Sequence, residues 1–220
     1  MFQYAVSRKL ATELGLQLRA NPIDGFPETQ TKIDGLRFFV RRQRQTGHRL
    51  DPIRPGHKII MDGLFQRIEY LPEISQLRKW FHLEREEAYS PRADLALSVR
   101  RGWNGYPTDL CPSQEYYFEI LKSLEFRTLR IFTDSPDDTY FTSFLTKFPN
   151  TILERGGAIE QFRKLSSARR VIMAPSTFTF WATYLGNAEE IFWPQIDALN
   201  FREKEMDWFP RGDSRVVPIG

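Results

Sequence analysis

The sequence contains a single cysteine, Cys111, among its 220 residues. A disulfide within the chain is therefore excluded, which is the pattern of proteins in a reducing compartment. No stretch approaches the roughly 18 consecutive apolar residues of a membrane span, and no secretory signal is visible. These absences favour a cytoplasmic location, with which a peripheral association with a membrane is compatible.

Several signatures of catalysis and metal binding are also missing. The sequence has no Walker loop, no nucleophile elbow and no glycine fingerprint for a dinucleotide. Its three histidines, at positions 48, 57 and 82, lie far apart without the spacing of metal ligands. Cys111 has no histidine close in sequence, which disfavours a nucleophilic thiol. We therefore expect neither a metal ion nor a bound cofactor.

The charge is nearly balanced, with 31 basic and 28 acidic residues and a net charge of +3. This balance argues against a general nucleic-acid binder, although the isoelectric point near 9.0 is compatible with a basic patch on the surface. The candidate patch is a run of arginines at positions 37, 41, 42 and 44, on a possible short helix over 36–45. It could bind nucleic acid or an anionic membrane, but we interpret it as a solvated face.

The first part of the chain alternates short elements with irregular stretches. Apolar residues at helical spacing predict a helix over 1–14, and Gly15 is placed to end it. Residues 21–32 contain Pro22, Gly25 and Pro27 and predict a loop. The remaining expected elements are a short strand over 58–61, a turn at Asp62 and Gly63, and a helix from Ile74 to about His82.

From about residue 92 onward, strands and helices alternate regularly. The apolar run in Asp94–Val99 lacks a helical period, which is typical of a strand covered on both faces. Four strand–helix repeats predict an α/β fold with a parallel, doubly wound sheet, followed by an irregular tail after Pro194. The expected strands are 94–99, 128–133, 151–153, 171–173 and 191–193, and the helices carry the apolar stripes 117–124, 141–148, 158–168 and 178–185.

Polar residues follow three of these strands. Arg100, Arg101 and Gly102 follow the first strand, Asp134 follows the second, and Ser176 with Thr177 precedes the last helix. Ligands bind at the carboxyl ends of strands in such sheets, and a helix N-terminus favours an anion. Arginines supply the forked donors that recognise phosphate, and Gly102 allows close approach of the backbone. The pattern predicts a diphosphate site.

Each piece also has an ordinary explanation. Ser176 or Thr177 could cap the helix, Asp137 and Asp138 could be turn residues, and the arginines could be solvated strand ends. Asp134 with the two later aspartates could hold Mg²⁺, but no further carboxylate has a clear spacing to them. The convergence of the three strand ends on one edge favours the functional interpretation.

Five segments resemble motifs of the α-1,2-fucosyltransferases, glycosyltransferase family eleven. Residues 1–5 (MFQYA) resemble part of the family's GxGNQMFQYA motif, and residues 98–103 (SVRRGW) resemble HxRRGD. The other three segments are residues 61–66 (MDGLFQ), 131–134 (IFTD) and 175–185 (PSTFTFWATYL), which resemble DGYFQ, FSDD and NSTFSWWAAWL. The five occur in the family's order and span residues 1 to about 193.

The resemblance implies a GT-B architecture of two Rossmann-like domains, and inverting, metal-independent transfer of fucose from GDP-fucose to a galactoside hydroxyl of a glycan. Residues 1–90 would form an acceptor-side domain, mostly helical, and residues 91–220 the donor-binding domain. The implied donor-binding residues are Arg100, which would also be catalytic, with Arg101, Gly102, Asp134, Ser176, Thr177 and Phe178, and the implied acceptor-binding residues are Trp103 and Tyr106. The general base stays open between candidates such as Asp109 and Glu115.

The chain departs from the family's motifs at three places. It begins after the GxGNQ loop, so we expect the first strand of the N-terminal domain to be missing, and an edge exposed in that way would favour homo-oligomers. Ser98 and Trp103 replace the His and Asp of HxRRGD, and Pro175 replaces the Asn of the last motif. An alternative is therefore a diverged, non-catalytic relative that binds a nucleotide or a sugar.

Overall fold

The computed structural model describes residues 1–29, 42–54, 56–82, 94–101, 111–195, 207 and 212–219. The chain divides into two compact units, residues 1–83 with 202–210, and residues 84–201 with 211–220. The expected second domain ran without interruption from residue 91, whereas Asp207 pairs with the first unit. The backbone N–H of Asp207 donates to the carbonyl of Gln66 at 2.9 Å, and Ile68 donates to the carbonyl of Asp207 at 2.5 Å.

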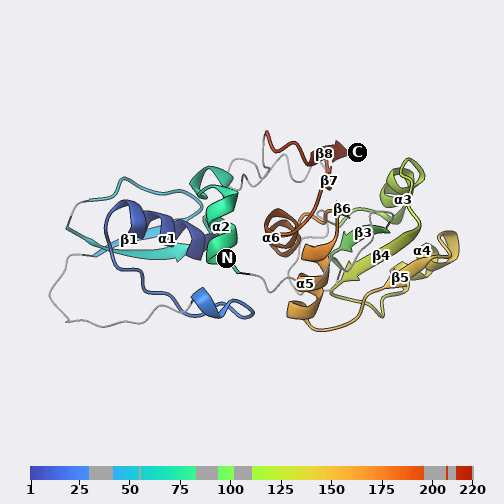
Figure 1. Ribbon diagram of the computed structural model, residues 1–220, viewed down its shortest axis with the longest axis horizontal. Helices are drawn as coiled ribbons and strands as arrows, with labels where there is room; N and C mark the ends of the chain where they lie inside the picture. Colours follow the sequence, from blue (N-terminus) through green and yellow to red (C-terminus); the bar gives the residue numbers. More distant parts are fainter. Residues whose placement is uncertain are drawn as a thin grey trace. The chain divides into compact units, whose positions relative to one another are not determined.

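The first unit begins with the predicted helix, α1 (Phe2–Glu13) (Figure 1). This helix buries its side chains at positions 2, 4, 5 and 6. The predicted stop at Gly15 is confirmed, because this residue has a φ of +63° in the left-handed region that glycine adopts without strain. The N–H of Leu16 donates to the carbonyl of Ala11 at 2.8 Å, as in a Schellman ending. Short 3₁₀ turns η1 (Pro27–Thr29) and η2 (Ile68–Tyr70) and helix α2 (Ile74–Trp80) complete the unit's helical elements within the described ranges.

The helix expected over 36–45 is wrong for its described residues, because β1 (Arg42–Gly47) is a strand. It pairs in parallel with β2 (Lys58–Gly63), which includes the two residues expected to form a turn. The buried side-chain amide of Gln45 bonds twice with the backbone of Asp51, at 2.8 and 3.1 Å. Because the inward residues of β1 are polar glutamines bonded to the following loop, its sequence lacks the apolar alternation of an ordinary strand.

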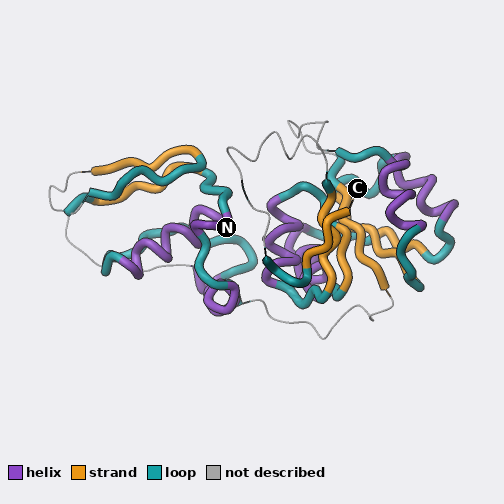
Figure 2. Tube along the Cα trace, turned by 90° about the horizontal axis from the view of Figure 1, so that it is seen from above, coloured by secondary structure: helices purple, strands orange, loops and turns teal. Residues whose placement is uncertain are grey.

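The second unit is an α/β layer around one parallel sheet, as the alternation predicted (Figure 2). The strand order is β5-β4-β3-β6-β7-β8, and every neighbouring pair is parallel. Counted from β3, this is the order 3-2-1-4-5-6 of doubly wound nucleotide-binding sheets. The strands are β3 (Asp94–Val99), β4 (Thr128–Thr133), β5 (Thr151–Leu153), β6 (Arg170–Ile172), β7 (Glu190–Pro194) and β8 (Val216–Ile219).

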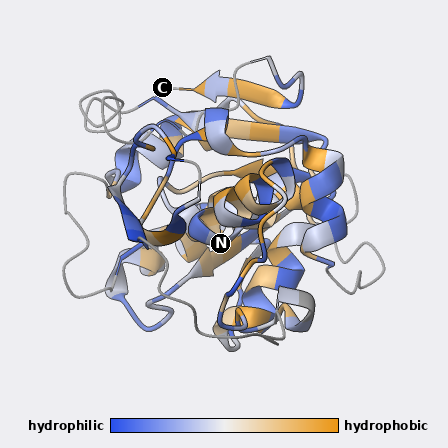
Figure 3. Cartoon of the chain, turned by 90° about the vertical axis from the view of Figure 1, so that its left-hand side faces the viewer, coloured by the Kyte–Doolittle hydropathy of each residue, from blue (hydrophilic) through white to orange (hydrophobic). Residues whose placement is uncertain are grey.

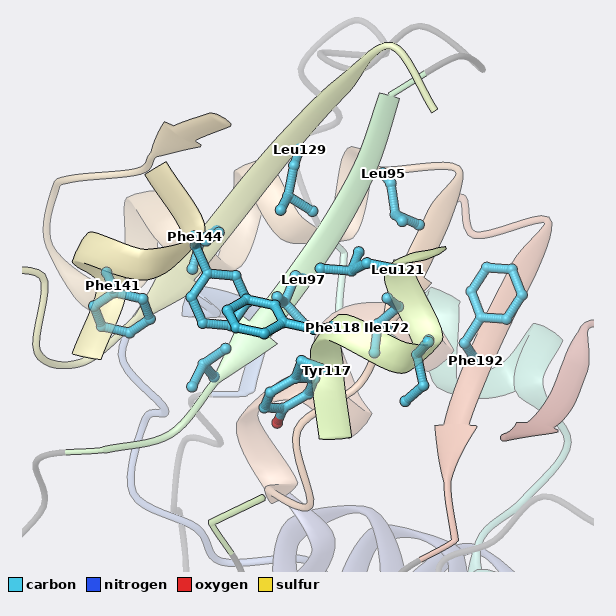
Figure 4. Close-up of a cluster of buried hydrophobic side chains, with 13 residues drawn as sticks. Leu95, Leu97, Tyr117, Phe118, Leu121, Leu129, Phe141, Phe144, Ile172 and Phe192 are labelled. Carbon is cyan, nitrogen blue, oxygen red and sulfur yellow. The ribbon is translucent and has the colours of Figure 1, made fainter. Parts of the chain in front are cut away.

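Helices cover both faces of this sheet (Figure 1). One face packs against α3 (Gln114–Lys122) and α4 (Thr142–Lys147), and the other against α5 (Ala158–Ser167) and α6 (Thr177–Leu185). Alternate residues of β3, namely Leu95, Leu97 and Val99, enter an apolar core with the aromatic rings of α3 and α4 (Figure 4). Burial of each such side chain stabilises the fold by about 1.5–3 kcal/mol.

Two expectations for this unit need correction. Leu145 is 47% exposed, although it was expected in the buried stripe of 141–148. The segment is not one α-helix, because the 3₁₀ turn η4 (Thr139–Phe141) precedes a helix of only six residues, and Phe141 and Phe144 take the buried positions. The tail is not wholly irregular either, because β8 joins the sheet beside β7 and is drawn largely in the hydrophobic colour in Figure 3.

Glycine 186 shows a second way in which a helix ending is fixed. It follows α6 as predicted, but its φ of −78° is an ordinary value. A Cβ atom at this position would lie 2.2 Å from the carbonyl oxygen of Ser166 at the end of α5. Glycine is therefore required here because two helices approach closely.

Candidate functional site

The carboxyl ends of β3 and β6 are adjacent in the sheet, at the point where the strand order reverses. In open α/β sheets this switch point is where ligands bind, because the loops after the two strands diverge to opposite faces. Arg100 and Arg101 follow β3 here, and Ser176 with α6 follows β6. The predicted grouping of these residues on one edge of the sheet is confirmed.

Both arginines contact carboxylates that follow the neighbouring strand β4. The Nε atom of Arg100 lies 3.2 Å from Oδ2 of Asp134, whose Oδ1 accepts the backbone N–H of Arg101 at 2.8 Å. The Nε atom of Arg101 donates to Oδ2 of Asp138 at 3.1 Å. The four side chains are between 22% and 30% exposed, so the charges are partly shielded yet remain accessible to a solute.

Asp138 is held by its own turn as well as by the arginine. Its Oδ1 accepts the backbone N–H of Tyr140 at 2.9 Å, and this bond caps η4. The bond from Tyr140 lowers the pKa of Asp138, burial opposes it, and the hydrogen bond and charge of Arg101 lower the pKa further. Asp138 is therefore a fixed anion beside Arg101.

Tyr140 lies beneath the second arginine. The guanidinium carbon of Arg101 is 4.2 Å from the centre of the Tyr140 ring, within the range of a cation–π contact. Burial raises the pKa of Tyr140 well above its ordinary value of 10.0, although the charge of Arg101 acts in the opposite direction. Tyr140 is therefore a neutral phenol at physiological pH.

A chain of hydroxyl groups joins the end of β3 to the start of α6. The Oγ atom of Ser98 lies 2.7 Å from Oγ1 of Thr179, which is 3.1 Å from Oγ of Ser176. All three side chains are buried. Ser176 caps α6 as expected, since its Oγ accepts the backbone N–H of Thr179 at 3.2 Å. These linked hydroxyl groups fix the start of α6 against β3, the strand that the two arginines follow.

The first two backbone N–H groups of α6, those of Thr177 and Phe178, have no intrahelical acceptor because of their place at the helix start. They are the donors that an anion at this helix would use. The ring of Phe178 packs edge to face against that of Phe162 on α5, with 5.4 Å between the ring centres. The Phe178 side chain therefore contributes to packing.

Not every expected site residue is among those that the structure describes. Gly102, Trp103, Tyr106 and Asp109 lie outside the described residues. Glu115 is exposed in the first turn of α3, after the predicted cap at Ser113. In the basic run, Arg42 is exposed and Arg44 forms an exposed ion pair with Asp62 at 3.3 Å. Arg37 and Arg41 also lie outside the described residues.

Sequence reasoning missed three residues of this edge. Thr179 was not singled out, although its spacing of three from Ser176 is that of a capping turn. Asp138 was interpreted as a turn residue, which it also is, and Tyr140 had no role. The contacts of Asp138 and Tyr140 with Arg101 join residues that are far apart in the sequence. Asp138, for example, lies 37 positions after Arg101. A motif of short range cannot reveal such pairs.

In the described part of the chain, no group of three or more His, Cys, Asp or Glu side chains has the arrangement of a metal site. The helices of that part are all too short or too polar to cross a membrane.

The chain was also compared with known proteins. Comparisons with protein-family models, with curated proteins and with solved structures returned no match. The function is therefore inferred from the residues of the site and from the motif resemblance.

Proposed function

We propose that the protein is a glycosyltransferase that transfers fucose from GDP-fucose to a galactoside hydroxyl of a glycan, with inversion and without a metal ion. One observation carries the proposal: three segments that resemble the family's motifs meet at the switch point of one sheet. Ser98 in the HxRRGD-like segment contacts Thr179 in the NSTF-like segment at 2.7 Å. Arg100 of the former contacts Asp134 of the FSDD-like segment at 3.2 Å.

The chemistry of the transfer explains why such residues would be needed. Breaking the bond between fucose and phosphate builds negative charge on the departing GDP. Without a metal ion, Arg100 and Arg101 would stabilise that charge together with the first N–H groups of α6. The acceptor hydroxyl would attack from the opposite face of the sugar. In a GT-B arrangement, the first compact unit would contribute the acceptor contacts.

A second candidate is a non-catalytic protein that binds a GDP-sugar, and Ser98 favours it. Ser98 replaces the histidine of the family motif, and its hydroxyl is buried against Thr179. A serine in this position has no imidazole with which to bind a ligand or move a proton. Trp103, in place of the motif aspartate, also favours this candidate because an indole ring carries no negative charge.

Two measurements test the proposal in sequence. Calorimetric titration with GDP, and with UDP as the control, tests recognition of the nucleotide. Release of GDP from GDP-fucose, measured with and without a β-galactoside, tests transfer. Binding of GDP with acceptor-dependent release supports the enzyme, and binding without release supports the second candidate. Failure to bind GDP more tightly than UDP would remove both.

A further inference from the structure

Arg101 is held at three points, although it is a surface arginine. Its backbone N–H donates to Asp134 at 2.8 Å, its Nε donates to Asp138 at 3.1 Å, and its guanidinium lies 4.2 Å from the Tyr140 ring centre. Within the described ranges, neither of its two Nη nitrogens has a hydrogen-bond partner. The side chain is therefore fixed at one end of the guanidinium and has donors at the other.

Asp138 and Tyr140, which hold the Arg101 side chain, are themselves anchored within the second unit. Asp138 uses one carboxylate oxygen for the backbone of Tyr140 and the other for Arg101. The Tyr140 hydroxyl donates to the carbonyl of Pro112 at 3.1 Å, and its ring contacts Phe141 and Phe144 at 5.2 and 5.7 Å. Phe141 and Phe144 are fully buried. The orientation of Arg101 is therefore set by the packing beneath it.

We propose that Asp138 and Tyr140 are positioning residues, which orient Arg101 so that its two Nη nitrogens form a two-point fork for a phosphate group. This inference rests on the proposed function, since a diphosphate at the switch point is the ligand of the fork. An arginine with a free side chain would lose rotamer freedom when it bound phosphate. Arg101 has already lost that freedom in the folded protein, so more of the binding free energy is retained.

The test uses Tyr140→Leu, because this substitution removes the aromatic surface without changing charge. We expect GDP affinity to fall by about two- to tenfold, the range for ordering one long side chain. Tyr140→Phe keeps the ring and loses only the bond to Pro112, so it should bind GDP almost as the wild type does. The decisive comparison repeats Tyr140→Leu in an Arg101→Gln background, where we expect no further loss.

Equal losses from Tyr140→Leu in both backgrounds would overturn the inference, because the ring would then act without Arg101. Inorganic pyrophosphate serves as a second probe and separates this failure from failure of the proposed function. Suppose that pyrophosphate binds with the same coupling between Tyr140 and Arg101, and that GDP binds no more tightly than pyrophosphate. The positioning role then stands and the GDP-sugar proposal fails. If neither probe binds, the positioning role and the proposed function are both overturned.

A readout without ligand tests the role of Asp138. The Nε–H group of Arg101 should give a resolved NMR signal that exchanges slowly with water, because Asp138 accepts its hydrogen bond. Asp138→Ala should collapse this signal into the fast-exchanging arginine population, and Asp137→Ala should leave it unchanged, because Asp137 lies 82% exposed and pairs with Arg155. An Arg101 signal that survives Asp138→Ala would contradict the assignment.

Discussion

Ser98 and Thr179 lie 81 positions apart in the sequence, yet their hydroxyl oxygens are 2.7 Å apart in a buried contact. The contact joins the end of strand β3 to the first turn of α6 across the switch point of the sheet. It therefore sets the distance between the arginine pair and the helix start, the two parts of the candidate anion site.

This contact gives the first prediction. Thr179→Val keeps the shape of the side chain but removes its hydroxyl, which leaves the Ser98 hydroxyl without that partner in a buried position. We expect the free energy of unfolding to fall by about 1–3 kcal/mol, measured by urea denaturation. Thr146→Val is the matched control, since the Thr146 hydroxyl bonds only to the exposed carbonyl of Thr142. Similar losses for the two variants would contradict the structural role of the contact.

A second prediction concerns the charges beneath β3, β4 and β5. Arg130 contacts Asp94 at 3.1 Å and Glu154 at 2.8 Å, and these two carboxylates are only 1% and 5% exposed. Arg130→Met should destabilise the protein by about 3 kcal/mol, because it leaves two buried carboxylates each with fewer cationic partners. Arg155→Met breaks an exposed pair with Asp137 and should cost about 1 kcal/mol or less. Chemical denaturation measures the loss of unfolding free energy in both variants. A loss for Arg130→Met no larger than that for Arg155→Met would show that the buried network is unimportant.

The third prediction is a dependence of stability on pH at Asp138. The pKa of Asp138 is lowered in the folded state from an ordinary value of 3.8, chiefly by the hydrogen bond from the backbone of Tyr140. Its ionised form therefore stabilises the fold above pH 3.8, and this contribution is lost as the pH falls through the lowered pKa. The difference in unfolding free energy between wild type and Asp138→Asn should be constant from pH 7 to about pH 5 and narrow below about pH 4. A difference that widened on acidification would have the wrong sign.

Much of the second unit's fold could be predicted because its signals are local. The five strands from 94 to 193 were expected within one residue at each described end, since buried parallel strands are short apolar runs between polar loops. β8 was missed because it has four residues, includes Pro218 and lies at the sheet edge, where a missing N–H is tolerated. β1 was mistaken for a helix because its inward residues are glutamines that bond to a loop.

The candidate site was predictable to a smaller extent. A parallel sheet brings the carboxyl ends of its strands to one edge, so the grouping of Arg100, Asp134 and Ser176 followed from strand order alone. The partners of each arginine did not, because a contact such as that of Arg101 with Tyr140 depends on side-chain rotamers and on the turn at η4. Sequence patterns carry no information on such rotamers.

A fourth prediction is that GDP binding does not require a metal ion. The arginine pair and the helix start would supply the positive charge that a divalent cation supplies in other nucleotide sites. Calorimetric titration with GDP should give the same affinity in buffer with EDTA as in buffer with added Mg²⁺. A large loss of affinity with the chelator, restored by Mg²⁺, would show that the carboxylates after β4 hold a metal instead.

The last prediction concerns Arg100, whose contribution is the most direct consequence of the proposed diphosphate site. Arg100→Ala should weaken GDP binding by about ten- to a hundredfold, the value of a charge-assisted hydrogen bond. Arg100→Lys should restore only part of this loss, because the point charge of an ammonium group cannot reproduce the planar, forked donors of a guanidinium. Arg42→Ala, which removes an exposed arginine of the first unit, is the matched control for general electropositivity.

The decisive measurement is the titration of GDP into wild type, Arg100→Ala and Arg42→Ala, each at low and high salt. A diphosphate site at the end of β3 predicts a large loss of GDP affinity for Arg100→Ala that persists at high salt, and almost no change for Arg42→Ala. Equal losses in the two variants that disappear at high salt would contradict it. The end of β3 would then be an ordinary solvated strand terminus.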